Sequence, residues 1–459
     1  MRPRGIVYIV WIIIACLGVI SWAVPEGGWY IGTYNLRFPT LVEVLDMQDN
    51  SSGVIDSTML ADLEIMDVDT VAVTQDSIPV ADTVSKPAEV KIPAVAIANI
   101  DTRAYLSAFY NALDSVSQMP VRVVHYGDSQ IEEDRITNVL REQWQEQYGG
   151  GGVGVIPLHQ TIPTRTIRQR LSMNGVVQST QGGPKRCLVY GPRSMRLVDS
   201  DDYGVMGQVA VLDSTLVDGS EDVVLTIEPI DKKRKSYHYF SRVRVLTDSI
   251  RVNNLEIGIK NLELDDSTTH CELRLQGRGH VYGISVETPT GVIVDNIPMR
   301  GCSGNIFTKI DSTQLSEFFR ETNTRLIILQ FGGNMIPQTE NPSTINGYVR
   351  STLRQQVRYI RACAPYASIL FVGPSDMSTN IDGVMTTYPL VPYMDKLFKR
   401  MAEEEGVAYW SMYDAMGGYN SMVAWHDKGL AGSDYVHFTR AGANNIGKKL
   451  YKWIMESKQ

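Results

Sequence analysis

Residues Val121–Arg135 read VRVVHYGDSQIEEDR, and this stretch predicts the fold of the chain. It begins with an apolar, β-branched run, which is typical of a strand buried on both faces of a parallel sheet. Open α/β sheets bind ligands at the carboxyl edge of their strands, and the turn Gly127-Asp128-Ser129 would lie at that edge. A helical pattern of apolar residues among charged ones then follows, with Ile131, Val139, Leu140 and Trp144.

Ser129 is the candidate nucleophile. A helix that begins directly behind it would offer free N–H groups and the positive end of a helix dipole to a developing oxyanion. Short Gly-Asp-Ser turns also occur where a strand simply ends, so the assignment depends on partners elsewhere in the chain.

Length and charge limit the classes of protein to consider. A chain of 459 residues predicts two or three folding units, and its 43% hydrophobic content is ordinary for a globular protein. The net charge of −8 argues against nucleic acid as a partner. Residues 41–91 hold 11 acidic residues and two lysines, so this segment carries −9 and the remainder +1. The acidity therefore belongs to one segment.

The N-terminal residues predict an export signal. Ile6–Val24 are 19 consecutive uncharged, mostly apolar positions, close to the length that spans a bilayer. Arg2 and Arg4 precede them, so the positive-inside rule places the N-terminus in the cytoplasm and the remainder outside. A cleaved secretory signal and a lipoprotein signal modified at Cys16 are the alternatives. An uncleaved anchor is favoured because apolar residues continue past Cys16 without a clear cleavage site.

Residues 1–30 are thus predicted to be an anchor or signal, and residues 31–100 an acidic flexible tether. The tether is rich in Asp, Ser, Val and Thr, contains prolines and lacks sustained periodicity. An accessory β-element is the alternative there. Asp101–Ser117 predicts an amphipathic helix with Asp101 as its N-cap. Its apolar face is expected to hold Tyr105, Ala108, Phe109 and Leu113.

Residues 155–279 predict an antiparallel β-sandwich inserted into the α/β domain. Short alternating runs recur between Asp, Gly, Ser and Asn turns, and no long helix interrupts them. The distance of 203 residues from Ser129 to Gly332 far exceeds the few tens that a crossover needs. The basic turn Asp231–Lys235 is either a solvated hairpin tip or a grip for an acidic glycan. The expected strands are Val209–Leu212, Val223–Ile227, Val243–Leu246, Leu255–Ile259 and Cys271–Leu275.

From His280 the α/β pattern returns, so residues 101–154 and 280–459 are expected to form one domain. Alternating strands and helices predict a parallel sheet covered on both faces. The expected elements are a strand pair over residues 280–298, the helix Ser312–Asn323, the strand Leu326–Leu329, the helix Tyr348–Ala362, the strand Ser368–Val372, the helix Pro392–Glu405, the strand Val407–Trp410 and the helix Ala441–Ser457.

Four positions are expected where strands leave this sheet, and together they resemble the SGNH (GDSL-type) hydrolase superfamily. They are the block Gly127-Asp128-Ser129, a lone glycine after a strand, the block Gly332-Gly333-Asn334-Met335 and the pair Asp434 and His437. Gly301 matches the lone glycine best, with Gly304 in reserve. Gln130 stands where many members have leucine, and Met335 stands where the family has aspartate.

The resemblance implies a flavodoxin-like three-layer fold and a cofactor-free serine esterase. Ser129 would attack an ester carbonyl, His437 would act as general base and acid, and Asp434 would orient the imidazole. The Ser129 and Gly301 backbone N–H groups and the Asn334 side-chain amide would form the oxyanion hole. His426 is a weaker base candidate because no carboxylate lies three residues ahead of it.

The resemblance also suggests a substrate and a location. Exported SGNH enzymes with a membrane anchor and an inserted sandwich look like polysaccharide or peptidoglycan O-acetylesterases and O-acetyltransferases, the latter working with a membrane-bound acyltransferase. The expected location is the inner membrane, with the catalytic domain in the periplasm or outside the cell, or secretion after signal cleavage. A non-catalytic glycan-binding scaffold is the third possibility. No metal cluster is visible, and the spacing of the five cysteines fits no zinc or redox motif, so one disulfide stays open.

Overall fold

The computed structural model describes most of the second half of the chain and part of the first. Its two compact units are Met1–Val84 and Ser85–Gln459. In the first unit the described residues form one antiparallel pair, β1 (Trp29–Ile31) with β2 (Tyr34–Leu36). The described residues are 29–31, 34–36, 93–98, 100–158, 160, 162–171, 176–180, 187–190, 195–198, 205–206, 210–213, 223–230, 235–247, 251–252, 260–276 and 278–458.

The predicted membrane anchor, its alternatives and nearly all of the predicted tether lie outside these residues. Among the residues that the structure does describe, no helix combines the length and the apolar character that crossing a membrane requires.

A five-stranded parallel sheet forms the centre of the second unit. Its strands lie in the order β16-β3-β17-β18-β21, and every neighbouring pair is parallel. In chain order this is 2-1-3-4-5, the flavodoxin-like order, which confirms the predicted fold. The strands are β3 (Val121–Gly127), β16 (Val292–Pro298), β17 (Thr324–Gln330), β18 (Ser368–Val372) and β21 (Ala408–Trp410).

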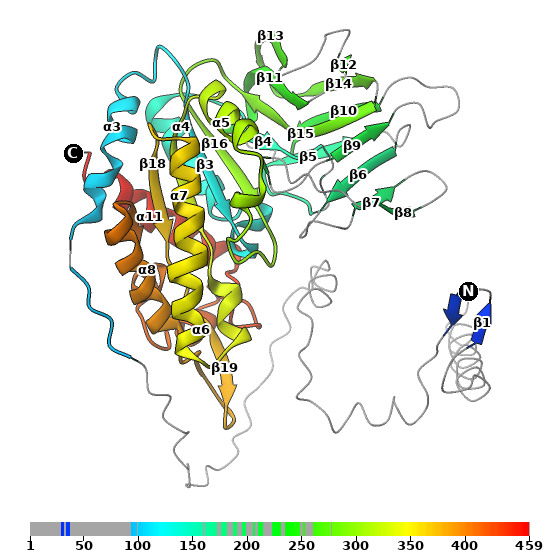
Figure 1. The fold of residues 1–459 in the computed structure, drawn as a ribbon. Helices are drawn as coiled ribbons and strands as arrows, with labels where there is room; N and C mark the ends of the chain where they lie inside the picture. Colours follow the sequence, from blue (N-terminus) through cyan, green and yellow to red (C-terminus); the bar gives the residue numbers. More distant parts are fainter. Residues whose placement is uncertain are drawn as a thin grey trace, which may run out of the picture. The chain divides into compact units, whose positions relative to one another are not determined.

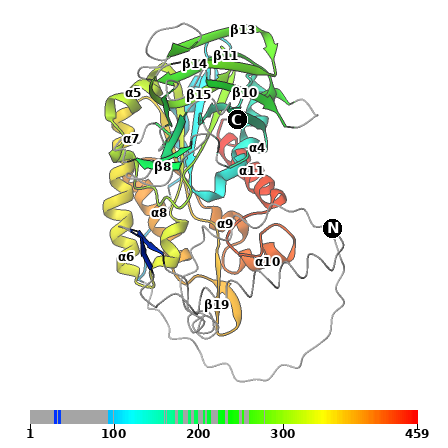
Figure 2. The ribbon, with the colours of Figure 1, turned by 90° about the vertical axis from the view of Figure 1, so that its right-hand side faces the viewer.

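Helices cover both faces of this sheet and complete three layers (Figure 1, Figure 2). The first face packs against α3 (Ser107–Leu113), α4 (Thr137–Tyr148) and α11 (Arg440–Met455). The second packs against α5 (Ser312–Glu321), α7 (Arg354–Cys363) and α8 (Val391–Glu405). Along β3 the side chains alternate between the two cores: Val121 and Val123 lie in one, Val124 and Tyr126 in the other.

Several short elements complete this domain. They are α6 (Pro342–Gly347), a π-helical turn at Tyr348–Leu353, the hairpin β19 (Ser378–Ile381) and β20 (Val384–Thr387), α9 (Met412–Met416) and α10 (Ser421–Asp427). The predicted helix Tyr348–Ala362 is therefore the π-helical turn continued by α7.

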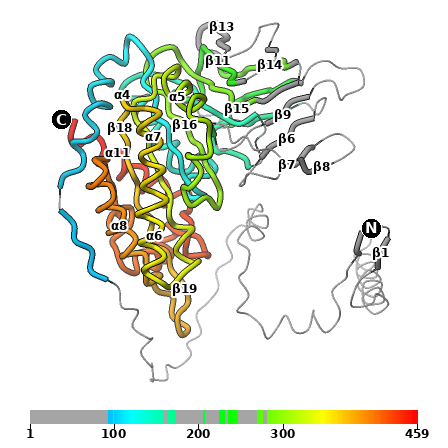
Figure 3. Tube along the Cα trace, in the orientation of Figure 1, coloured from blue at the N-terminus to red at the C-terminus, as the bar shows by residue number. Residues whose placement is uncertain are grey.

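Two antiparallel sheets lie between α4 and β16 in chain order, and Figure 3 shows labelled strands of both, β14 with β11 and β15, side by side. The first has the order β12-β14-β10-β5, and the second β13-β11-β15-β9-β6-β7-β8, with β4 also paired to β15. One hydrophobic core contains side chains from both, for example Leu225 and Leu273 with Val243 and Ile284. The strands are β4 (Gly154–Ile156), β5 (Ile167–Leu171), β6 (Val176–Thr180), β7 (Cys187–Tyr190), β8 (Met195–Val198), β9 (Ala210–Asp213), β10 (Val223–Pro229), β11 (Phe240–Thr247), β12 (Arg251–Val252), β13 (Lys260–Thr268), β14 (Cys271–Gln276) and β15 (Arg278–Glu287).

The predicted boundary at residue 279 is wrong by about one strand. β15 continues to Glu287 and pairs antiparallel with β11, β9 and β4, so it belongs to the inserted sheets and not to the α/β domain. The sequence pattern misled because β15 and β16 are both rich in β-branched residues and only a short turn separates them. The predicted strand Leu255–Ile259 and most of the basic turn Asp231–Lys235 lie outside the described residues.

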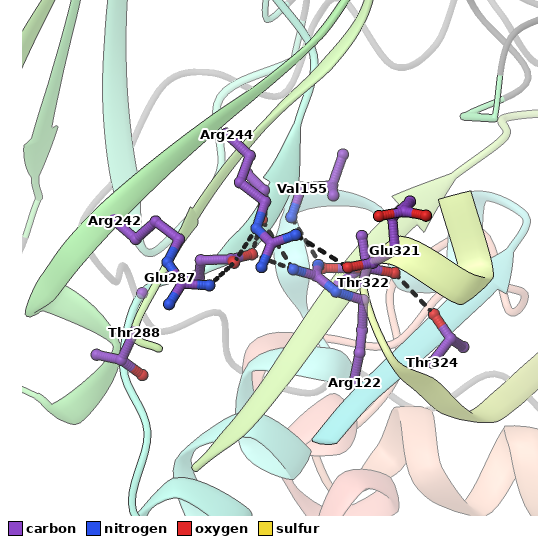
Figure 4. Close-up of polar contacts among 12 residues, drawn as sticks. Arg122, Val155, Arg242, Arg244, Glu287, Thr288, Glu321, Thr322 and Thr324 are labelled. Carbon is purple, nitrogen blue, oxygen red and sulfur yellow. Dashed lines mark hydrogen bonds and ion pairs between the residues drawn. The ribbon is translucent and has the colours of Figure 1, made fainter. Parts of the chain in front are cut away.

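A buried cluster of charges joins the inserted sheets to the parallel sheet (Figure 4). Glu287 on β15 pairs with Arg244 at 2.6 Å and with Arg122 on β3, and Arg122 also pairs with Asp295 on β16. Burial alone would raise the pKa of Glu287, but the surrounding arginines outweigh it and the pKa lies below its ordinary value. The inserted sheets are thus attached to β3 itself, the strand that ends next to Ser129.

The predicted helix Asp101–Ser117 differs from the structure. Asp101 caps a 3₁₀ turn, Thr102–Leu106, and α3 begins only at Ser107. A 3₁₀ helix has three residues per turn where an α-helix has 3.6, so a different set of side chains points toward the core. Tyr105 and Ala108 are consequently exposed, while Leu106, Phe109 and Leu113 are buried.

Candidate active site

The nucleophile segment, residues Asp128–Asp134, begins where β3 ends. Asp128 accepts a hydrogen bond from the Gln130 N–H at 3.0 Å, and Ser129 opens a 3₁₀ segment, Ser129–Asp134. This segment breaks at Glu132 and Glu133, and α4 starts only at Thr137. The helix expected behind Ser129 is therefore present at first only as a short 3₁₀ segment, because the backbone leaves helical geometry at Glu132 and Glu133 before α4 begins.

Ser129, His437 and Asp434 form a continuous hydrogen-bonded chain. Ser129 Oγ lies 2.8 Å from His437 Nε2, and His437 Nδ1 lies 2.6 Å from Asp434 Oδ2. The Asp434 carboxylate thus fixes the tautomer in which Nδ1 carries the proton and Nε2 accepts from the serine hydroxyl. The structure brings together the three residues that the sequence singled out for catalysis.

The base loop, Gly432–His437, is held by its own hydrogen bonds. Asp434 Oδ1 accepts from the N–H groups of Val436 at 2.9 Å and His437 at 3.0 Å, and Gly432 N–H donates to His437 O. Burial opposes ionisation of Asp434, but the hydrogen bonds from His437 and from these N–H groups lower its pKa to about 2. The carboxylate therefore stays charged at neutral pH, opposite the imidazole.

The sequence had suggested that the base loop follows a strand of the sheet, but the structure shows that it does not. It lies between α10 and α11, where a single antiparallel bridge joins Ala431 to Phe438. It stands ahead of the last helix, as expected, and the Gln130 side chain attaches it to the nucleophile segment. Gln130 Nε2 donates to Val436 O at 2.6 Å, a contact that the leucine common in the family would not make.

Asn334 lies beside the nucleophile segment, after β17. Its Nδ2 donates to Asp128 Oδ2 at 3.3 Å and to Cys302 O at 3.2 Å. Glycine is required at position 332, where φ is +118° and a Cβ would lie 2.5 Å from the Phe398 ring. The side-chain amide of Asn334 is therefore fixed next to Asp128, one residue before Ser129.

Gly301 lies in a turn that is attached to the end of β3. Met299 N–H donates to Gly127 O at 2.7 Å, and Cys302 N–H closes the turn on Met299 O at 2.9 Å. Gly301 is the third residue of this turn with φ +70°, the position where a type II turn favours glycine. It is exposed, whereas Gly304 is buried with its N–H directed to Cys302 Sγ at 3.3 Å. Of these two glycines, Gly301 is the one with an exposed backbone beside the nucleophile segment.

Asp128 is buried, and its burial raises its pKa to about 6 in spite of the Gln130 N–H and the nearby His437, which act in the opposite direction. The site thus contains two carboxyl groups with very different acidity: Asp128, which directly precedes Ser129 in the chain, and Asp434, which is hydrogen-bonded to His437.

The remaining candidates lie apart from this chain of contacts. His426 stacks on Tyr435, with 4.3 Å between ring centroids, and its nearest ionic partner is Asp427. Met335 packs at the edge of the hydrophobic core. Cys271, Cys302 and Cys363 are free thiols, and the described part of the chain contains no group of three or more His, Cys, Asp or Glu side chains placed to hold a metal ion.

Sequence reasoning missed the ion pairs formed by the acidic residues that follow Ser129 in the chain. Glu132, Glu133 and Asp134 each pair with an arginine. The available signal was the run of three acidic residues that begins three positions after Ser129. Acidic runs are usually solvated, however, and the arginine partners lie elsewhere in the sequence.

Comparison with known proteins agrees with this geometry. Residues 266–444 match the GDSL-like Lipase/Acylhydrolase family. The matched range contains Gly301, Asn334, Asp434 and His437 but not Ser129, which the inserted sheets separate from it. No curated protein sequence matches the chain.

Among solved structures, a peptidoglycan O-acetylesterase superposes with a TM-score of 0.60 at 21% identity. The match covers 78% of this chain and 98% of the other, so the two share their fold. An acetyl xylan esterase from Geobacillus stearothermophilus (TM-score 0.27, 18% identity, 36% of this chain and 73% of the other) also matches. So does a lipopolysaccharide acetyltransferase periplasmic domain from Salmonella ser. Paratyphi A (TM-score 0.26, 13% identity, 36% and 72%). Residues 266–444 are therefore similar to GDSL-like lipases and acylhydrolases, and the chain shares its fold with the superposed esterase structure.

Proposed function

We propose that this protein removes O-acetyl groups from a cell-envelope polysaccharide through an acyl-enzyme on Ser129. The observation that carries the proposal is the continuous chain from Ser129 Oγ through His437 to Asp434, with distances of 2.8 and 2.6 Å. A nucleophile in contact with a base that a third group orients is the arrangement that acyl transfer requires.

The reaction proceeds in two halves. Ser129 Oγ attacks the acetyl carbonyl carbon while its proton passes to His437 Nε2. The bond between carbonyl carbon and sugar oxygen then breaks, and His437 returns the proton to the leaving sugar hydroxyl. Water attacks the acetyl-serine next, gives one proton to His437, and the carbon–serine bond breaks to release acetate. His437 returns that proton to Ser129.

Charge develops on the carbonyl oxygen in both halves. The backbone N–H groups of Ser129 and Gly301 and the Asn334 amide are the proposed donors to this oxyanion, each typically worth about 3–4 kcal/mol. Asn334 would exchange one of its two hydrogen bonds, to Asp128 or to Cys302, for the bond to the oxyanion. Asp434, whose pKa is held at about 2, stabilises the imidazolium that forms at the same time.

The substrate class rests on similarity. The superposed structure is described as a peptidoglycan O-acetylesterase, and 78% of this chain takes part in the match. The inserted antiparallel sheets are the part proposed to bind glycan. Export through the N-terminal apolar segment would place the enzyme where such a polymer lies, in the periplasm or outside the cell.

The test measures acetate released from O-acetylated peptidoglycan by wild-type protein, Ser129→Ala and a control, Ser351→Ala, whose exposed hydroxyl bonds to Gly347 O in the α6–α7 segment. Ser129→Ala should lower kcat at least about 10³-fold, and the control should retain it. Acetate release that is unchanged in Ser129→Ala would show that Ser129 is not the nucleophile, and no release by the wild-type protein would leave only a glycan-binding role. If adding an acetyl donor and a glycan gave acetylated glycan as the main product, the protein would be an O-acetyltransferase instead.

A further inference from the structure

Three consecutive carboxylates follow the nucleophile, and each pairs with an arginine from a different part of the chain. Two of the three acidic residues, Glu133 and Asp134, have left-handed backbones with φ of +57° and +63°, which side-chain-bearing residues adopt only when their surroundings hold them. The pairs are Glu132 with Arg300 after β16, Glu133 with Arg165 ahead of β5, and Asp134 with Arg141 on α4.

The pair Glu132–Arg300 forms two hydrogen bonds, one to each carboxylate oxygen. Arg300 Nε lies 2.8 Å from Glu132 Oε1, and Arg300 Nη2 lies 2.9 Å from Oε2. The Glu132 side chain is 5% exposed and that of Arg300 is 38% exposed. Two parallel charge-assisted hydrogen bonds to a buried carboxylate define both the distance and the orientation of the guanidinium.

Arg300 is the second residue of the Met299–Cys302 turn, directly before Gly301. The backbone of this turn is attached to β3 only at its start, through Met299 N–H to Gly127 O. Further along, a Cβ built on Gly301 would meet no atom within 4 Å, so packing does not locate this residue. At the end of the turn, the Asn334 amide joins Cys302 O to Asp128. Between these two attachments, the Arg300 side chain ties the exposed part of the turn directly to Glu132.

We propose that Glu132 and Arg300 are positioning residues for the proposed esterase reaction. Their ion pair holds the Gly301 N–H at the place where it stabilises the oxyanion formed on attack by Ser129. Neither side chain touches the substrate. The inference rests on the proposed function, since it assigns a task to residues around the same nucleophile.

The experiment compares Arg300→Gln with Arg358→Gln. Arg358 forms the same two-bond arrangement with Glu405, at 2.9 and 2.8 Å, and Glu405 is 6% exposed, but this pair joins α7 to the end of α8. The substrate is p-nitrophenyl acetate, which carries no net charge that Arg300 could bind. Rates are expressed per active serine, counted by titration with a fluorophosphonate, so a partly unfolded sample does not imitate a slow enzyme.

Arg300→Gln should lower kcat and kcat/KM together by about 10- to 100-fold with little change in KM, because only the transition state uses the oxyanion donor. Arg300→Lys, which keeps the charge but loses the paired geometry, should recover part of the rate. Arg358→Gln should keep wild-type kcat. Equal kcat in Arg300→Gln and wild type would overturn the inference.

The double variant Glu132→Gln/Arg300→Gln covers the case in which Arg300→Gln alone does not fold, because it leaves no unpaired buried charge. Its kcat should fall about as far as that of Arg300→Gln, since the two residues act as one unit. A double variant with wild-type kcat would also overturn the inference. These outcomes are separate from the fate of the proposed function, because Ser129→Ala tests that function by acetate release from O-acetylated peptidoglycan.

Discussion

Ser129 and His437 lie 2.8 Å apart, yet the segments that carry them are held by different kinds of contact. The base loop relies on Asp434, whose carboxylate binds groups within three residues of itself and whose side chain is 48% exposed. The nucleophile segment relies on arginines from 7 to 168 residues away, two of them paired with carboxylates that are at most 5% exposed. Gln130 joins the two regions.

Because of this difference, we expect substitutions in the two regions to affect different quantities, the catalytic rate in one and the stability of the fold in the other. A locally bonded, exposed loop can lose its key carboxylate and still fold, because little else depends on it. A buried carboxylate paired with a distant arginine cannot be removed alone without leaving an uncompensated charge in the interior. Substitutions in the base loop should therefore affect the rate, and substitutions in the nucleophile segment should affect folding as well.

Asp434→Asn should give the largest effect and should touch the rate alone. An amide in place of the carboxylate no longer fixes the productive imidazole tautomer or stabilises its charge, so kcat should fall about 10²- to 10⁴-fold. The free energy of unfolding should change by no more than about 1 kcal/mol, because the group is half exposed. Turnover of p-nitrophenyl acetate and urea unfolding measure the two quantities. A variant that loses stability as strongly as activity would contradict the distinction between the regions.

Asp134→Asn should show the opposite pattern. Asp134 pairs with Arg141, both side chains are nearly buried, and Arg141 would keep its charge without a partner. We expect the free energy of unfolding to fall by about 3–5 kcal/mol. Asp382→Asn is the matched control, because Asp382 is exposed and its φ of +51° suits asparagine. If both variants unfold at the same urea concentration, the buried pair does not support the nucleophile segment.

The same contrast explains which features the sequence could predict. The strand before Ser129 and the spacing from Asp434 to His437 are local sequence patterns that can be recognised without knowing the fold. In the structure, Ser129 bonds to His437 and His437 bonds to Asp434. The five parallel strands were expected for the same reason, since each is a short apolar run with a turn after it.

Features that depend on distant partners could not be predicted. Glu132 pairs with Arg300 across 168 residues, and nothing in the local sequence names that partner. The strand β15 resembles β16 in composition, and only its antiparallel neighbours assign it to the inserted sheets. The break in the expected helix behind Ser129 has the same origin, because the left-handed residues Glu133 and Asp134 are held by Arg165 and Arg141.

The nucleophile segment and the base loop should also differ in how their carboxyl groups make the stability depend on pH, an effect smaller than those of the two substitutions above. Asp128 is the group to test. Burial raises its pKa to about 6 from an ordinary value of 3.8, so between these values the folded chain holds a proton that the unfolded chain has released. Raising the pH through this window should therefore lower stability, by about 3 kcal/mol for this group alone. Asp434 acts in another window: its pKa of about 2 gives stability that is present above pH 3.8 and is lost as the pH falls toward 2.

Because burial raises the pKa of other carboxyl groups too, Asp395 among them, the quantity to measure is the difference between Asp128→Asn and wild type. Urea unfolding at pH 4, 5 and 6 gives this difference directly. The variant lacks the titrating group, so its stability should decline less than that of the wild type as the pH rises, with the gap growing toward pH 6. Parallel pH profiles for the two proteins would mean that Asp128 ionises as easily in the folded chain as in water. The nucleophile segment would then be more open to solvent than its contacts with Gln130 and Asn334 imply.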